Sequence, residues 1–344
     1  MPATSTQSSV DDPDVGSATR IGCFSEYGTL RAVVVGSVDG LAYPAWSPNV
    51  RYLSGSIKEL LVDAREREVD IRKQAPGAWE ALRGQIEEIV ATFERHNVQV
   101  LRPRPFEPLE LGYLGELQGG HSLLYPADPI YVLGRHVIET CIRRPFRRKE
   151  AWPTRDVLMP FIDADPEVQH VAIPRAHLGP AGNEGPGPFL EGGDIIILGN
   201  EVLCGNTDLT SNRAGSDWLA RYLSPFGYRV HPVPVYGTWL HLLGVLALLR
   251  EGLAIAHLPA LGGRLPKPIS SWDVIEVSEQ EARMLATVGM SLSPSLHIID
   301  RRLERVIGEL ERRGIEPVPV DVDVLSQWGG AVRCVALPIA RDPA

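Results

Sequence analysis

The sequence predicts an α/β fold in which about five similar units form a ring around a central site. Three observations carry this prediction. Short apolar, strand-like runs alternate with segments whose apolar residues recur at helical spacing, glycines stand where these segments turn or stop, and the order strand, helix, strand recurs along the chain. Because each unit has an apolar face, a ring of units buries these faces on neighbours and leaves a pocket at the centre.

The unit nearest the C-terminus shows the pattern most plainly. Residues 295–300 (SLHIID) form a predicted strand, and a helix with one apolar stripe follows it. That stripe consists of Leu303, Val306, Ile307 and Leu310. Gly314 then ends the helix, and the alternating segment 315–322 (IEPVPVDV) predicts a closing strand.

The other units are predicted from the same signals, in chain order. Glycines at hairpin turns, such as Gly134 and Gly199 before Asn200, favour tight connections between two strands. The predicted segments are a strand at 29–36 with a helix around 79–93 and a strand at 98–103; a hairpin at 128–140 leading through a helix to 168–174; a hairpin at 192–205 leading through a helix around 214–222 to 228–235; and a shorter unit at 244–277. The Gly/Pro-rich segment 176–190 and the segment 36–51 are predicted loops.

Length, charge and cysteine usage limit the classes of function that the chain can have. The chain has 344 residues and a net charge of -9, which disfavours general binding to nucleic-acid backbones and suits a cationic small substrate. Residues 1–20 are small, polar and acidic, so we expect a disordered tail followed by a single domain at 21–344. The chain has no apolar run of membrane-spanning length, and its four cysteines lack metal-site spacing, so a reducing cytoplasm is the default expectation.

Five residues at the ends of predicted strands are candidates for a catalytic or binding role, and each also has a purely structural interpretation. They are Asp128, Glu191, Asp194, His241 and Cys334. Asp128 is either a turn former or a carboxylate that pairs with a cationic group. Of the two acids around the glycines in LEGGD, one can cap backbone donors and the other can hold a histidine, unless both serve only as caps. His241 lies in apolar surroundings, where a histidine taken alone is more often a satisfied core residue than a functional one.

Cys334 follows Gly329-Gly330 and a strand-like run near the C-terminus. A buried core cysteine is one interpretation, and a nucleophile at the mouth of a pocket is the other. Arg333 directly precedes it, and a nearby cation favours the thiolate. Cysteine, histidine and an acid can act together when they are far apart in sequence. The cluster Arg143, Arg144, Arg147, Arg148 and Lys149 is interpreted as a solvated helix start rather than a nucleic-acid patch.

Taken in order, these stretches resemble the amidinotransferase group of the guanidine-modifying enzyme superfamily. The resemblance covers nearly everything after residue 20. It includes FSEYGTLRAVVVG at 24–36, LLYPADPIYVLGRHVIET at 123–140, the Arg-rich RRPFRRKEAW at 143–152, LEGGD at 190–194 and WGGAVRC at 328–334. It implies the pentein fold, a five-unit pseudo-symmetric β/α propeller around a central active site, which agrees with the unit count above.

The resemblance also implies roles for the candidate residues. Cys334 would be the nucleophile, His241 the general acid/base, and Glu191 the acid that orients His241. Asp128 would grip the guanidinium, and Asp194 would support the site or its hairpin. The implied activity moves an amidino group from arginine, or a related guanidino donor, to an amine acceptor through a covalent amidino-cysteine. No metal or organic cofactor is implied; relatives are often dimers, which leaves a homodimer open, and a secondary-metabolite role follows only by analogy.

Departures from the family pattern keep two alternatives open. Leu243 stands where many relatives have a second guanidinium-binding acid, Ala127 replaces an arginine, and Ala331 replaces a third glycine. A hydrolase of the arginine deiminase or dimethylargininase type would use the same covalent intermediate, with water as the acceptor. A binding or scaffold protein on a decayed enzyme fold is a third hypothesis, although the cysteine, histidine and acid are all present.

Overall fold

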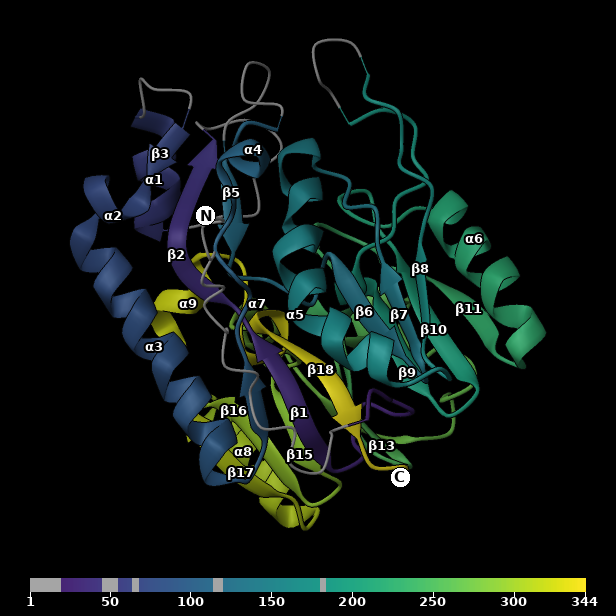
Figure 1. The fold of residues 1–344 in the computed structure, drawn as a ribbon. Helices are drawn as coiled ribbons and strands as arrows, with labels where there is room; N and C mark the ends of the chain where they lie inside the picture. Colours follow the sequence, from purple (N-terminus) through teal and green to yellow (C-terminus); the bar gives the residue numbers. More distant parts are fainter. Residues whose placement is uncertain (1–19, 45–54, 64–67, 114–119, 180–183) are drawn as a thin grey trace, which may run out of the picture.

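In the computed structural model of the chain, the described residues are 20–44, 55–63, 68–113, 120–179 and 184–344 (Figure 1). The tail predicted at residues 1–20 lies outside them except for Arg20. No helix among the described residues is long and apolar enough to cross a membrane.

Five three-stranded sheets share one pattern of pairing, and this confirms the mixed α/β class. In each sheet the central strand pairs antiparallel with one neighbour and parallel with the other. The sheets consist of β6 (Ile130–Leu133), β7 (His136–Glu139) and β8 (Gln169–Ala172); β9 (Ile195–Leu198), β10 (Glu201–Asn206) and β11 (Arg229–Pro234); β12 (Leu246–Arg250), β13 (Leu253–Ala256) and β14 (Asp273–Glu276); β15 (Met290–Ser293), β16 (Leu296–Asp300) and β17 (Glu316–Val320); and β18 (Ala336–Arg341), β1 (Leu30–Val35) and β4 (Gln99–Leu101).

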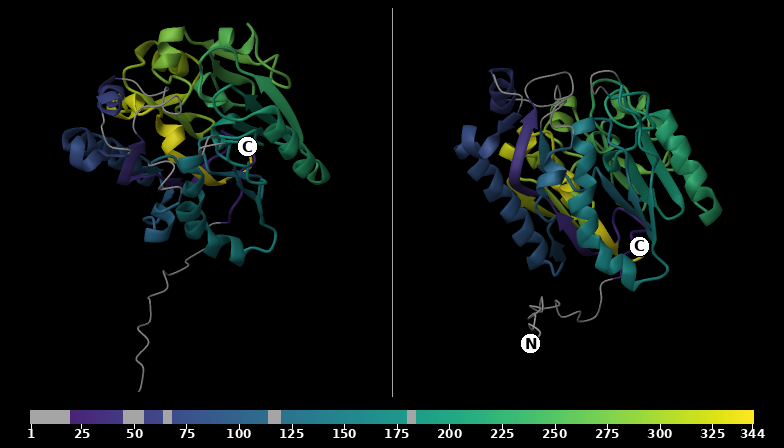
Figure 2. Two further views of the ribbon diagram at one scale, coloured as in Figure 1. Left: turned by 90° about the horizontal axis from the view of Figure 1, so that it is seen from above. Right: turned by 45° about the horizontal axis from the view of Figure 1, so that its top comes forward.

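The connections explain the pattern. Gly134 and Gly199 adopt φ of 54° and 55°, as expected of the two predicted hairpin turns. A parallel neighbour needs a crossover, and the crossovers contain helices. These are α3 (Pro76–Arg95), α5 (Ala151–Ala164), α6 (Arg213–Leu223) and α8 (Glu304–Arg312), while the β13–β14 crossover has only the short η7 (Leu258–Leu261). Figures 1 and 2 show α3 and α6 on opposite outer flanks with strands between them.

The two ends of the chain meet in one sheet. β1 pairs antiparallel with β18, with Leu30 opposite Arg341. Five residues of these two strands, Val33, Val34, Val35, Leu337 and Ile339, have no exposed surface. This pairing places the segment that carries Cys334, just before β18, at the junction of the first and last units of the chain.

A sixth sheet corrects one sequence prediction. The segment 36–51 was predicted to be a loop, but β2 (Ser37–Pro44) is a strand between β3 (Glu68–Asp70) and β5 (His121–Leu123), and residues 45–51 lie outside the described part. Polar Ser37 and Asp39 with Gly40 obscured its alternation. The described part of the loop predicted at 176–190 contains no helix or named strand.

The remaining helices are short. They are α1 (Gly55–Asp63), α2 (Ile71–Gln74), η2 (Pro145–Glu150), α4 (Pro108–Leu111), η4 (Gly192–Asp194), η5 (Ser224–Phe226), η6 (Leu242–Gly244), α7 (Glu279–Arg283), α9 (Asp323–Gln327) and α10 (Val332–Val335). Three of them, η4, η6 and α10, carry or adjoin candidate site residues, and η2 carries Arg147.

Candidate active site

Two connected hollows bring the candidate residues together. The inner chamber, about 230 Å³, is lined by Tyr125, Asp128, Arg147, Leu240, His241, Gly329 and Cys334. The outer cleft, about 1380 Å³ including open solvent, shares Leu240, His241, Gly329 and Cys334 with it. These four shared residues form the neck between the two hollows. The predicted thiol, imidazole and carboxylate therefore face one space, although they come from distant parts of the chain.

His241 is held by Glu191, as the sequence led us to expect of one acid in LEGGD. The ring Nε2 lies 2.9 Å from Glu191 Oε2 and 4.0 Å from Asp128 Oδ1. Glu191 has no exposed surface, and its Oε1 accepts a hydrogen bond from the Arg143 backbone N–H. Gly193 lets the ring approach, because a Cβ there would lie 2.6 Å from His241 Cγ and Nδ1. The EGGD sequence thus supplies both the partner of the ring and the space for it.

Asp194, the second acid, binds the loops around the site. Its Oδ1 accepts from the Leu242 backbone N–H at 2.8 Å, and its Oδ2 accepts from Thr210 Oγ1 at 2.6 Å and Ser211 N–H at 3.1 Å. Asp194 is fully buried and lines neither hollow. Burial raises its pKa, against the opposing influence of His241 and these donors. These contacts position the residue after His241 and fit the supporting role expected of Asp194.

Asp128 presents one carboxylate oxygen to the chamber side of His241 and gives the other to an arginine. Arg147 Nη1 donates to Asp128 Oδ2 at 3.0 Å, and the same guanidinium donates to both oxygens of Glu150 at 2.9–3.1 Å. All three side chains are buried. Burial raises the pKa of Glu150 to about 7, despite Arg147. This pairing fixes Asp128 and places a guanidinium against one of its carboxylate oxygens.

The basic cluster corrects a second sequence prediction. We interpreted residues 143–149 as a solvated helix start, but Arg144, Arg147 and Lys149 are 2–3% exposed. Arg147 lines the chamber, and Arg144 Nη1 lies 3.8 Å from Glu191 Oε1. The acid three positions after Arg147, Glu150, was the local signal of a pair. Burial next to two site carboxylates could not be seen in the sequence.

Cys334 differs from the other cysteines in its access. Cys23, Cys141 and Cys204 are buried, whereas Cys334 is partly exposed and faces both hollows. Gly329 takes a φ of 87°, and a Cβ on Gly330 would lie 2.6 Å from the Tyr125 ring. These glycines allow the chain to turn closely under Tyr125 just before α10. The sulfur is therefore not sealed in hydrocarbon.

The electrostatics of the site favour a protonated thiol and a protonated imidazole. Burial and then the charge of Asp128 raise the pKa of Cys334 to about 12. Burial alone would lower the pKa of His241, but Asp128 and the hydrogen bond to Glu191 outweigh it and raise the pKa to about 9. Burial disfavours the Glu191 carboxylate, but the His241 hydrogen bond and the charge of Arg144 lower its pKa to about 2. At neutral pH the thiol and the imidazole both carry protons.

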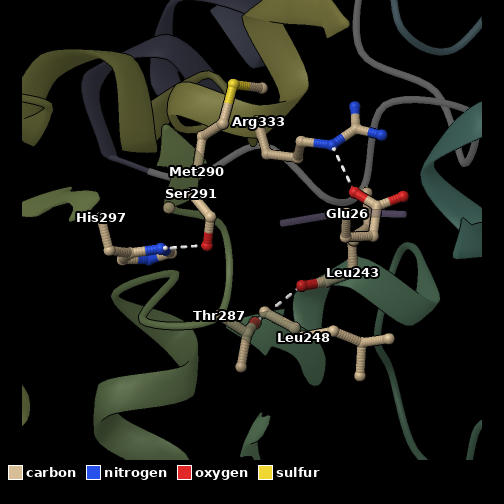
Figure 3. Close-up of a pocket in the computed structure, with 10 residues that line it drawn as sticks. Glu26, Leu243, Leu248, Thr287, Met290, Ser291, His297 and Arg333 are labelled. Atoms are coloured by element: carbon tan, nitrogen blue, oxygen red, sulfur yellow. Dashed lines mark hydrogen bonds and ion pairs between the residues drawn. The ribbon is translucent and has the colours of Figure 1, made fainter. Parts of the chain in front are cut away.

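Arg333 points away from the thiol. Figure 3 shows it reaching Glu26, with Nε 3.2 Å from Oε2, across a separate cavity of about 280 Å³. Tyr131 Oη donates to the other oxygen of Glu26 at 2.6 Å. Arg333 still lowers the pKa of Cys334, as expected of a nearby cation, but burial and the charge of Asp128 raise that pKa by more. In the same cavity Thr287 Oγ1 donates to the Leu243 carbonyl, which fixes the backbone beside His241.

Three of these side chains also satisfy the geometry of a metal site. Asp128, Glu191 and His241 each offer one atom within 4.8 Å of the others. A planar cation with several N–H donors matches two carboxylates equally well. Arg147 already makes such a contact with Asp128, so the donor set fits a guanidinium as well as an ion.

The chain is similar to proteins of one enzymatic group over nearly its whole length. It is 25% identical over 346 residues to a putative inosamine-phosphate amidinotransferase 2 of Streptomyces griseus, covering 94% of this chain and 97% of that protein. It is 21% identical to an L-arginine:L-lysine amidinotransferase of Pseudomonas savastanoi pv. phaseolicola, covering 92% and 93%. No family model matches the chain.

Solved structures share its fold. An inosamine-phosphate amidinotransferase from Streptomyces griseus superposes with a TM-score of 0.76 at 19% identity, covering 95% of this chain and 98% of that one. An amidinotransferase of Microseira wollei from a saxitoxin biosynthetic pathway gives 0.76 at 20% identity, covering 94% and 98%. A dimethylarginine dimethylaminohydrolase of Pseudomonas aeruginosa gives 0.61 at 17% identity, covering 90% and 99%.

Proposed function

We propose that the chain belongs to the amidinotransferase group of the guanidine-modifying enzyme superfamily. On this premise, it transfers an amidino group from arginine or a related guanidino compound to an amine through a covalent amidino-cysteine. We also infer that its five matching sheets form the β/α propeller of this superfamily around the chamber. The observation that carries the function is the shared chamber: Cys334, His241 and Asp128 line one space, with Glu191 2.9 Å behind the imidazole.

Binding of the donor would prepare the thiol. Oδ1 of Asp128 lies on the His241 side, 4.0 Å from Nε2, so a guanidinium bound at this oxygen would neutralise the charge that helps raise the pKa of Cys334. A positive charge beside the sulfur favours loss of its proton. A guanidinium carbon is a poor electrophile, and a fixed, planar position opposite a thiolate compensates for that.

The two half-reactions follow from the same groups. The Cys334 thiol first releases its proton to water at the neck, and the thiolate Sγ then attacks the amidino carbon. The bond from that carbon to the donor nitrogen breaks, and the nitrogen takes a proton from His241. The acceptor amine then attacks the same carbon, the C–S bond breaks, and the proton of the amine returns to His241. A histidine pKa of about 9 keeps the acid form available for the first step at neutral pH. Glu191 holds the ring during both steps.

A direct assay separates transfer from hydrolysis. The enzyme is incubated with arginine, with and without amines, and ornithine, citrulline and guanidino product are measured. Transfer predicts ornithine only when an amine is present, together with an amidino adduct on Cys334 in mass spectra taken before the amine is added. Cys334→Ser should abolish both, and Cys141→Ser, at a buried position away from the chamber, should retain both.

A hydrolase is the second candidate, favoured by two observations. Leu243 stands where a second acid occurs in many relatives, and the fold also matches a dimethylarginine dimethylaminohydrolase. Citrulline formed without any amine would support this function and contradict transfer. A non-catalytic scaffold predicts instead that Cys334 reacts with thiol reagents no faster than the three buried cysteines.

A further inference from the structure

The walls of the outer cleft are mostly apolar, which is unusual for an enzyme that acts on cations. Of the described residues that line it, none is an aspartate or glutamate, and Arg283 is the one side chain with a permanent charge. Its apolar lining consists chiefly of Leu209, Trp239, Leu240, Leu243, Leu285 and Val288. The carboxylate that recognises a guanidinium, Asp128, lies only in the inner chamber. The two hollows therefore suit different parts of the chemistry.

The neck dictates how an acceptor reaches the reacting carbon. Cys334 and His241 line both hollows, so an amidino group on the sulfur is accessible from the outer cleft. The inner chamber is much smaller than the outer cleft, about 230 Å³ against about 1380 Å³ with open solvent included in both. An acceptor must therefore place its amine at the neck and the rest of its body in the cleft.

We infer that the acceptor is a primary amine carried on an apolar alkyl or aryl body without a second positive charge. This inference rests on the proposed function and adds the substrate class. Apolar walls reward burial of such a body, whereas a second ammonium would lose its water without gaining a carboxylate partner. Leu243 contributes to the selection directly, because it replaces a possible acid beside the neck with an apolar wall.

Two features indicate that the wall of the outer cleft is held in a fixed conformation. Leu285 has a φ of 64°, a left-handed conformation that leucine rarely adopts, at the end of α7 where glycine or asparagine is usual. Its side chain lines the cleft and packs on the neighbouring core. Arg283 stacks on Trp239 at 3.8 Å, donates to the Thr238 carbonyl at 3.1 Å and pairs with Glu279 Oε1 at 3.3 Å, so its side chain is fixed at the cleft. Because a guanidinium and no carboxylate lies among the described residues of this wall, a neutral or anionic far end of the acceptor fits this position better than a cationic one.

An acceptor panel tests the inference. With arginine as donor, kcat/KM is measured for phenethylamine and hexylamine, for lysine and putrescine, which carry additional charge, and for hydroxylamine, which has no body. We expect the apolar amines to exceed lysine and putrescine at least tenfold. Hydroxylamine separates the two levels of the proposal. If it yields no ornithine and no guanidino product, the proposed function fails; if it reacts but lysine or putrescine matches the apolar amines, only the acceptor class fails.

A variant makes the test specific to the wall. Leu285→Asn keeps a residue that tolerates left-handed backbone, so the melting temperature should hold or rise, while one apolar wall residue is lost. We expect kcat/KM for phenethylamine to fall about tenfold and kcat/KM for hydroxylamine to stay within twofold. Leu109→Asn, at an 89% exposed position of α4, is the matched control and should change neither. Equal losses for both amines in a correctly folded Leu285→Asn variant would refute the role of this wall.

Discussion

The charge of Asp128 is expected to hold the thiol of Cys334 inactive until substrate arrives, and Asp128→Asn tests this directly. Asparagine keeps an oxygen that can accept from Arg147, so the 3.0 Å contact that orients the side chain can persist. The substitution removes the negative charge that is the second largest cause, after burial, of the raised pKa of Cys334. We therefore expect opposite changes in two properties of the same sulfur.

The magnitude follows from the pKa. A pKa of about 12 leaves roughly one thiol in ten thousand ionised at pH 8. A neighbouring charge typically shifts a pKa by about one unit or more, so its removal should raise the thiolate fraction about tenfold. Alkylation by neutral iodoacetamide should therefore accelerate about tenfold. Amidino transfer should fall by about a hundredfold or more, because the guanidinium has lost its carboxylate.

The assay is the rate of Cys334 labelling, followed by peptide mass spectrometry from pH 7 to 10, beside ornithine release from arginine. The three buried cysteines give an internal reference in each sample. Asp163→Asn, at an exposed position of α5, is the control and should alter neither rate. Slower or unchanged labelling in a folded Asp128→Asn variant would refute the view that this carboxylate sets the charge of the thiol.

Four further changes address the support of the imidazole. Glu191→Gln should lower the pKa of His241, because the partner that favours its charged form is lost, and the fall of kcat on the alkaline side should move to lower pH. Gly193→Ala should reduce kcat about a hundredfold with a smaller change in KM, because a Cβ 2.6 Å from the ring displaces it. Asp194→Asn should lower the free energy of unfolding by about 3 kcal/mol in denaturant titrations. Asparagine has one side-chain oxygen where aspartate has two, so some of the buried donors that bind Asp194, including Leu242 N–H, would lose their acceptor. His241→Gln should lower the free energy of unfolding relative to the unsubstituted protein below pH 6.5, and this difference should vanish as the pH rises through about 9. The reason is that the folded protein stabilises the protonated form of the His241 ring, which is what its raised pKa expresses. A difference that does not depend on pH would contradict the charge assigned to His241.

The sequence predicted the elements whose signals are local. The hairpin turns at Gly134 and Gly199 depend on neighbouring residues only, and both are present. Glu191 and Asp194 bracket two glycines, and the expectation that one holds a histidine and one takes backbone donors matches their contacts. Their catalytic roles remain predictions.

The features that the sequence did not predict depend on contacts between residues far apart in the chain. β1 and β18 pair across almost the whole chain, and periodicity within either strand does not reveal that. Arg147 looked solvated because basic residues usually are, and its burial depends on Asp128 and Glu150. The direction of Arg333 depends on the backbone of α10, which turns that side chain to Glu26 and leaves the next one, Cys334, at the neck.

The charges of the site also explain how one binding event prepares both reacting groups. In the empty chamber Asp128 raises the pKa of His241 and of Cys334, so both keep their protons. A guanidinium at Asp128 cancels this charge for both groups. The thiol then releases its proton more easily, and the imidazolium becomes a stronger acid for the departing nitrogen. In the proposed mechanism, the product amine leaves while the amidino group stays on sulfur, and the positive charge of that group would keep the pKa of His241 low. This would favour the neutral ring that must accept the proton of the incoming amine. A clamp of one carboxylate oxygen, with the other held by Arg147, would then time both proton transfers.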